Sequence, residues 1–135
     1  ALELGTGNLI WRDANRVGIT SLARTRTCLL VSSAREGLVC LDPRSRETVW
    51  RRPASRGAPG QPTVVDQVVV VGESEGGLVA VALDSGTELS RLEAGHGFSA
   101  QPAMSALRAG RPPFGVVLSN GGTLLAFRVG GAPLP

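Results

Sequence analysis

Residues Ala1–Trp11 read Ala-Leu-Glu-Leu-Gly-Thr-Gly-Asn-Leu-Ile-Trp, and the rest of the chain repeats their pattern. Taken alone, they predict a strand, a tight turn at Gly-Thr-Gly and a second strand that ends in Trp. Cys40–Trp50 has the same length: a small residue opens it, an acid stands third, a hydroxyl side chain sixth and Trp last. Ala80–Ser90 repeats this frame with Ser at the end, and Ala126 begins a fourth copy. The chain is therefore built from repeated sequence units.

Successive repeat units lie 40 residues apart, as the step from Cys28 to Val68 shows. Each unit predicts four short strands joined by turns that contain Gly, Ser or Asn. The expected first strands are 19–23, 61–65 and 100–105, the second 28–31, 68–71 and 116–118, the third 38–41, 78–82 and 124–128, and the fourth 48–52 and 87–92. The second strands are apolar on both faces, so both faces should be covered. Such units are typical of β-propeller blades.

The sequence therefore predicts an all-β, incomplete β-propeller of four-stranded antiparallel blades, about three blades of a larger ring. The predicted units are outer strands of a preceding blade over 1–12, full blades over 17–52 and 59–92, a last blade without its outer strand over 98–129, and a tail over 130–135. The last unit is longer because 107–113 is inserted. Because closure removes the edges of the sheets, we expect a remaining propeller segment in the same or another chain. We favour a preceding segment over a second copy of this chain, because in a pair of copies the strands 1–4 and 124–129 would compete for the same place.

Charge suggests one interaction surface. All 14 basic residues among the 135 are Arg, and ten of them lie between Arg12 and Arg56 against four acids. Arginines of one unit, expected to be exposed together, are candidates for docking an acidic protein partner, with an ordinary solvated surface as the alternative: Arg44, Arg46, Arg51, Arg52 and Arg56. No nucleic-acid-binding motif accompanies them. No apolar run approaches the roughly 20 residues of a membrane span.

The frame Ala-x-Asp/Glu-x-x-Thr/Ser-Gly-x-x-x-Trp resembles the tryptophan-docking repeat of the quinoprotein (PQQ-like) β-propellers. The matching residues are Ala1, Glu3, Thr6, Gly7 and Trp11 in the first copy, Cys40, Asp42, Ser45 and Trp50 in the second, and Ala80, Ser85 and Gly86 in the third. The resemblance implies that each Trp packs between neighbouring blades and that these residues are structural. Arg46 replaces Gly, and Ser90 replaces Trp, so the contact after the third copy should be weaker or filled otherwise.

The resemblance also implies two kinds of function. One group of this family holds pyrroloquinoline quinone and calcium and oxidises alcohols or sugars. The other binds no cofactor and is an interaction scaffold, as in the propeller lipoprotein of the bacterial outer-membrane assembly machine. The vicinal Cys pair of the enzymes is absent here. We therefore expect a non-catalytic scaffold of the periplasm or cell envelope, with protein partners and no cofactor or metal. The alternatives are a fragment of a PQQ-dependent dehydrogenase and a ligand-sensing propeller domain.

Three other side chains bear on function. His96 is the only His and lies in an inter-unit linker, where it is either a ligand contact or an ordinary exposed residue. With a three-residue hairpin loop, Cys28 would face Cys40, and a disulfide would be within reach. We favour two buried apolar side chains instead, because Val68 and Ala80 occupy the same places in the next unit. The cysteines therefore leave the compartment open.

Overall fold

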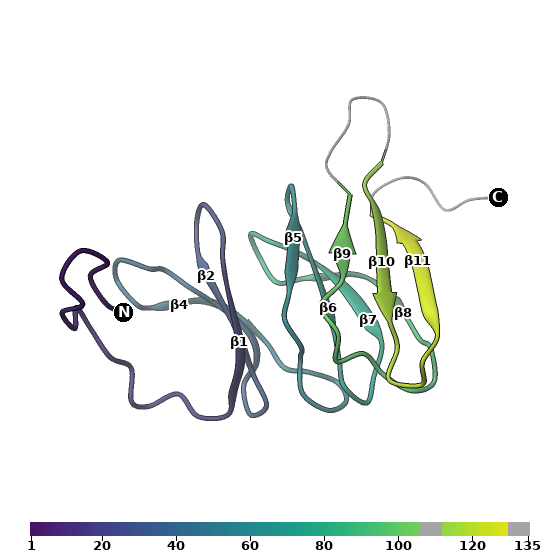
Figure 1. Cartoon of the computed structure of the whole chain (residues 1–135), viewed down its shortest axis with the longest axis horizontal. Helices are drawn as coiled ribbons and strands as arrows, with labels where there is room; N and C mark the ends of the chain where they lie inside the picture. Colours follow the sequence, from purple (N-terminus) through teal and green to yellow (C-terminus); the bar gives the residue numbers. More distant parts are fainter. Residues whose placement is uncertain (106–111, 130–135) are drawn as a thin grey trace.

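The computed structural model describes residues 1–105 and 112–129 (Figure 1). The predicted tail and most of the predicted insertion lie outside these residues. Within them, eleven strands form three separate antiparallel sheets. In each sheet every strand pairs with its neighbours in sequence, so each sheet is a simple meander. The all-β prediction is confirmed.

The strands follow the repeat. The first sheet contains β1 (Ile19–Arg24), β2 (Leu29–Ser33), β3 (Gly37–Leu41) and β4 (Thr48–Arg52). The second contains β5 (Thr63–Val65), β6 (Val68–Gly72), β7 (Leu78–Ala82) and β8 (Glu88–Leu92). The third contains β9 (Ala103–Met104), β10 (Phe114–Leu118) and β11 (Leu124–Arg128), with β11 at its edge. The first strands of the second and third sheets are shorter than the sequence predicts.

The three sheets lie side by side in chain order (Figure 1). Alternate valines of β6 explain why the second sheet is covered on both faces. Val69 and Val71 belong to the apolar cluster that includes Leu30 and Trp50 of the first sheet. Val70 belongs to the cluster that includes Val117 of the third sheet. We call the contact of the first and second sheets the first junction and that of the second and third sheets the second junction.

The N-terminal hairpin is less regular than the sequence predicts. In place of two strands it has a single antiparallel bridge between Leu2 and Leu9. Leu4 and Ile10 are exposed, like both bridge residues. A two-stranded hairpin that no third strand or sheet covers is only marginally stable, which explains the short pairing.

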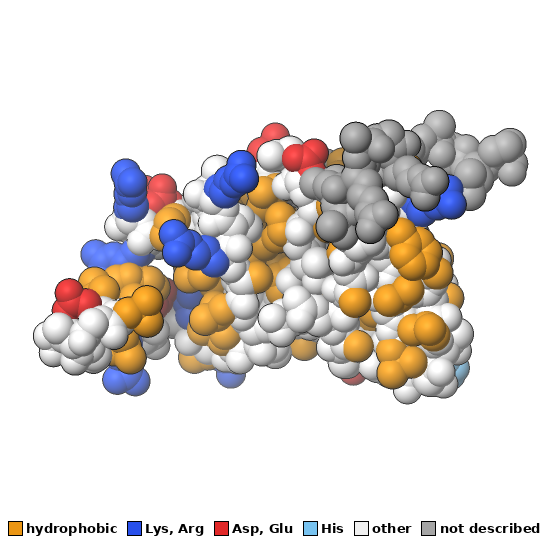
Figure 2. Space-filling view, turned by 45° about the horizontal axis from the view of Figure 1, so that its top comes forward, with side chains coloured by type: hydrophobic (Ala, Val, Ile, Leu, Met, Phe, Trp, Pro, Cys, Tyr) orange, Lys and Arg blue, Asp and Glu red, His pale blue; other side chains and the backbone are white. Residues whose placement is uncertain are grey.

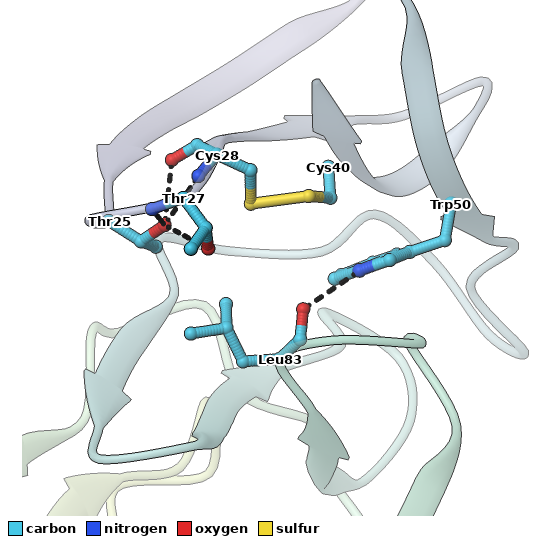
Figure 3. The surroundings of a disulfide bond; sticks show 6 residues. All are labelled: Thr25, Thr27, Cys28, Cys40, Trp50 and Leu83. Atoms are coloured by element: carbon cyan, nitrogen blue, oxygen red, sulfur yellow. Dashed lines mark hydrogen bonds between the residues drawn. A yellow bond between two sulfur atoms is a disulfide. The ribbon is translucent and has the colours of Figure 1, made fainter. Parts of the chain in front are cut away.

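Cys28 and Cys40 form a disulfide, so the interpretation as two separate apolar side chains is wrong (Figure 3). The expected hairpin register is wrong as well. Ser33 pairs with Gly37, and Leu30 lies opposite Cys40. Cys28 is therefore diagonal to Cys40, and their Cα atoms are 5.7 Å apart, within the usual range of roughly 4.4–6.8 Å. The bridge lies in the core of the first junction.

Candidate interaction site at the sheet junctions

The eleven-residue frame forms the same turn three times. In each copy the backbone N–H of the seventh residue donates to the carbonyl of the third at 2.8–2.9 Å. The seventh residue has a left-handed backbone, with φ of 72° at Gly7, 66° at Arg46 and 71° at Gly86. Gly adopts this conformation without steric cost, whereas a residue with a Cβ pays about 1–2 kcal/mol. The frame therefore encodes a turn that Arg46 tolerates but does not favour.

Polar side chains of the frame hold this turn. The Oδ1 atom of Asp42 accepts the backbone N–H groups of Arg44 at 2.7 Å and Ser45 at 3.0 Å. The bonds from Ser45 and then Arg44 lower the pKa of Asp42. The hydroxyl of the sixth residue accepts the N–H of the eighth in every copy, at 3.2 Å for Thr6 and 3.4 Å for Ser85. In the first copy, Thr6 also donates to Glu3.

Trp50 spans the first junction (Figure 3). It extends from β4, and its Nε1–H donates to the carbonyl of Leu83 at 2.9 Å. Only 8% of the residue is exposed. The indole packs directly on Gly86, where an added Cβ would lie 2.5 Å from a ring carbon. The seventh frame position thus needs Gly for two reasons, its backbone conformation and the close approach of the Trp from the preceding sheet.

The other two Trp positions differ. Trp11 is only half-buried. In the next copy of the frame, the seventh position, which is Gly86 beside Trp50, is occupied by Arg46. A side chain at that place would occupy the space that the indole fills at the first junction. Ser90 takes the Trp50 place at the second junction and is exposed. It lines a groove of about 410 Å³ with apolar residues of the second and third sheets, among them Val68, Leu78, Phe127 and Val129.

An ion-pair network at the first junction was not predicted from the sequence. Glu73, in the turn after β6, is completely buried. Its carboxylate accepts from Arg52 at 3.1 Å, from Arg91 at 2.9 Å and from the backbone N–H of Ser55 at 3.0 Å. Glu88 pairs with the same two arginines. Among the described residues, every buried side-chain polar atom has a hydrogen-bond partner.

The network keeps Glu73 ionised. Burial alone would raise the pKa of Glu73, but the hydrogen bonds from Arg91, Ser55 and Arg52 outweigh it and lower the pKa to about 2. The pKa of Glu88 is also lowered, mainly by Arg91. The pKa of Arg91 is raised, chiefly by Glu88. The two sheets are therefore joined by charged groups that stay charged across the physiological pH range.

The candidate arginines are not all exposed together. Arg52 is only 12% exposed at its side chain and pairs with Glu73 and Glu88, so its prediction as an exposed docking residue is wrong. Arg44 and Arg46 precede β4 and Arg56 follows it. A five-residue strand, about 16 Å long, separates these exposed groups. Figure 2 shows basic side chains mainly over the N-terminal half of the molecule.

His96 is exposed on the linker between the second and third sheets. Its ring packs on Gly121, where an added Cβ would lie 2.5 Å from the imidazole Cδ2. A ligand contact at His96 stays a prediction. In the ranges 1–105 and 112–129, no cluster of three or more His, Cys, Asp or Glu residues is arranged to hold a metal ion. No helix of that part of the chain is long and apolar enough to cross a membrane.

The three sheets and their repeated turns agree with comparisons to known proteins. The sequence profile of the family described as "Outer membrane protein assembly factor BamB" matches residues 1–132. The chain belongs to this family of PQQ-like propeller repeats. A search of curated proteins found no match.

Solved structures support the fold. The computationally designed Ika4 protein is similar with a TM-score of 0.64 and 13% identity, over 83% of this chain and 66% of that chain. The computationally designed Ika8 protein is similar with a TM-score of 0.66 and 17% identity, over 82% of this chain and 33% of that chain. This chain thus spans about two thirds and one third of their lengths. Its fold is an incomplete β-propeller of antiparallel blades.

Proposed function

We propose that this chain is part of a non-catalytic β-propeller scaffold of the cell envelope that binds protein partners. The observation that carries the proposal is the match of residues 1–132 to the family of an outer membrane protein assembly factor. The Cys28–Cys40 disulfide supports an oxidising compartment, because such bonds persist in the periplasm and outside cells.

In this proposal the sheets act as blades, with 1–12 as outer strands of a preceding blade, 17–52 and 59–92 as full blades, and 98–129 as a blade without its outer strand. The frame residues act as the docking elements between blades. For Trp50, the support is its bond to Leu83 and its packing on Gly86. A propeller built this way presents turns and linkers at both ends of each blade to partners.

The exposed arginines before β4 are the proposed contact for an acidic partner. Arg44 and Arg46 lie in one turn, and both are exposed. Exposed charges of this kind act mainly on the rate of association and are screened by salt.

The test is site-specific photo-cross-linking in cells from position 44, followed by mass spectrometry of the captured proteins. We expect envelope proteins, and we expect Arg44→Glu with Arg46→Glu to slow their association, as added salt does. Arg128→Glu, on β11, is the matched charge reversal and should have little effect. Quinone and calcium retained in stoichiometric amounts, together with dye-linked alcohol oxidation and no captured partner, would contradict the proposal.

A further inference from the structure

One arginine of the ion-pair network at the first junction, Arg91, has a counterpart in the first sheet. Arg91 lies opposite Val79 in the pairing of β7 and β8. Arg51 lies opposite Val39 in the pairing of β3 and β4, 40 residues earlier. Arg51 therefore occupies the place of Arg91 and points from the corresponding face of its sheet.

The two carboxylates that bind Arg91 are not repeated around Arg51. Counting back 40 residues, Ser33 stands at the place of Glu73 and Thr48 at the place of Glu88. The Ser33 hydroxyl donates to the carbonyl of Val17 at 3.0 Å. The Thr48 hydroxyl accepts from Arg16 at 3.0 Å. Neutral hydroxyls thus replace both anions.

A groove of about 390 Å³ lies at this place. Its lining comes from the linker before β1, the turn after β2 and β4: Asp13, Asn15, Arg16, Val17, Arg35, Glu36 and Arg51. Both acids of the lining are already bound by Arg16, Asp13 at 3.1 Å and Glu36 at 2.8 Å. Arg35 and Arg51 are exposed, and no carboxylate of the described residues pairs with either within 4 Å.

We propose that this groove binds a carboxylate of an acidic segment of a partner protein, with Arg51 and Arg35 as the donors. The partner's carboxylate would supply the anion that Glu73 and Glu88 supply to Arg91 within the chain. Guanidinium groups match carboxylates in a bidentate way. The proposal rests on the proposed function, because it names the chemistry of the protein partner and one place where it binds.

The charges of the groove favour a carboxylate over phosphate groups. Three arginines and two acids line it, which leaves a net charge of one positive unit. That charge matches a single carboxylate. The carboxylates of an acidic peptide lie on separate flexible side chains, so one can enter the groove while the others stay in solvent. The adjacent charges of a phosphate chain would approach Asp13 and Glu36 together and be repelled by them.

The first test uses the full chain and a fluorescein-labelled hexaglutamate peptide, with hexaglutamine as the neutral probe and fluorescence anisotropy as the readout. We expect hexaglutamate alone to bind. Arg51→Gln and Arg35→Gln should each weaken binding about tenfold, the loss expected for one charge-assisted hydrogen bond. Arg128→Gln, on β11 and outside the groove, removes the same charge from an exposed residue and should leave hexaglutamate binding unchanged.

The second test copies the neighbouring network into the groove. Thr48→Glu places a carboxylate where Glu88 stands, so it should occupy Arg51 and weaken hexaglutamate binding at least as much as Arg51→Gln does. Thr48 is exposed, so the fold should tolerate the change, and far-UV circular dichroism checks this. Gln67→Glu adds the same charge in the turn between β5 and β6 and should have no such effect.

Several outcomes would overturn the groove as a carboxylate site: equal binding of hexaglutamine, equal loss on Arg128→Gln, unchanged binding on Thr48→Glu, or stronger binding of polyphosphate than of hexaglutamate. The two proposals fail separately. Envelope proteins captured from position 44 without hexaglutamate binding would remove only the groove. Hexaglutamate binding with the expected arginine dependence but no captured protein would remove only the scaffold function.

Discussion

The first and second junctions use the same frame position in opposite ways. At the first, Trp50 fills the space between the sheets and donates a hydrogen bond to Leu83. At the second, Ser90 stands at the same place and lines a groove of about 410 Å³. The strands around both residues have the same register, with Cys40 opposite Trp50 and Ala80 opposite Ser90. The same frame position is therefore filled at one junction and open at the other, although the surrounding strands share one register.

The junctions also differ in where their other contacts lie. The first has the disulfide in its core and the Glu73 network beside it. At the second, the linker between β8 and β9 makes the tight contact, because its Phe98 is completely buried and packs on Gly72. An added Cβ at Gly72 would lie 2.5 Å from the Cβ of Phe98. The second junction therefore has a tight linker contact and a loosely packed outer strand.

Removal of the indole should have the largest effect. Trp50→Ala should destabilise the chain by about 3–5 kcal/mol, the range for a large aromatic lost from a core. Ser90→Ala is the matched change at the open junction and should stay within about 0.5 kcal/mol. Chemical denaturation of both variants measures the difference. Equal destabilisation would show that the frame position does not distinguish the junctions.

Loss of the disulfide should come next. The double variant Cys28→Val with Cys40→Ala carries the residues of the second sheet at these places, so it removes the bond with little change in core packing. Closing a loop of this size stabilises by about 3 kcal/mol. A reductant should lower the unfolding midpoint of the natural chain and leave that of the double variant unchanged. A reductant effect on both would assign the loss to something else.

The Glu73 network should make stability depend on acid pH. The pKa of Glu73 is below its ordinary value of 4.5 in the folded chain, at about 2. The unfolded chain therefore binds its proton first, and the stabilisation, complete above about pH 4.5, is lost as the pH falls toward about 2. Glu73→Gln should cost about 2 kcal/mol at neutral pH and flatten this acid profile. Parallel profiles for the two proteins would contradict this role.

Filling the open junction should have the smallest effect. Ser90→Trp places an indole beside the groove, with Val129 at the place that Leu83 has at the first junction. We expect a gain of about 0.5–2 kcal/mol, as for other cavity-filling changes. The measurement is the denaturation midpoint, with Ser90→Ala as the control. A loss of about 1–3 kcal/mol would mean that the groove is too narrow for the ring.

Local features of the sequence predict most of the strands. The repeated frame places its turn at Asp42–Glu47, and the four-valine run of 68–71 predicts a strand covered on both faces. These predictions succeed because hairpins and apolar strands are determined by nearby residues. The expected strand 100–105 is longer than the observed β9, because pairing with β10 reaches only Ala103 and Met104.

Contacts between sheets were harder to predict. Glu73 reads as an ordinary turn residue, and nothing local shows that Arg52 and Arg91 reach it from two different sheets. The prediction that Cys28 and Cys40 are separate apolar side chains is wrong for a similar reason. The register of β2 and β3 decides which residues lie near each other. A signal for the network was present nonetheless. Glu73 replaces the Ser33 of the preceding repeat, and a charge in place of a small hydroxyl in a buried turn needs a partner.

Amide hydrogen exchange on β4 and β8 tests most directly whether Trp50 makes the first junction more stable than the second. Both are the outer strands of four-stranded sheets, with the same length and register, and they differ at Trp50 and Ser90. We predict that the hydrogen-bonded amides of β4 exchange more slowly than those of β8, and that Trp50→Ala removes the difference. Equal protection of the two strands in the unmutated chain, or slower exchange in β8, would contradict a stabilising role of Trp50 at the first junction.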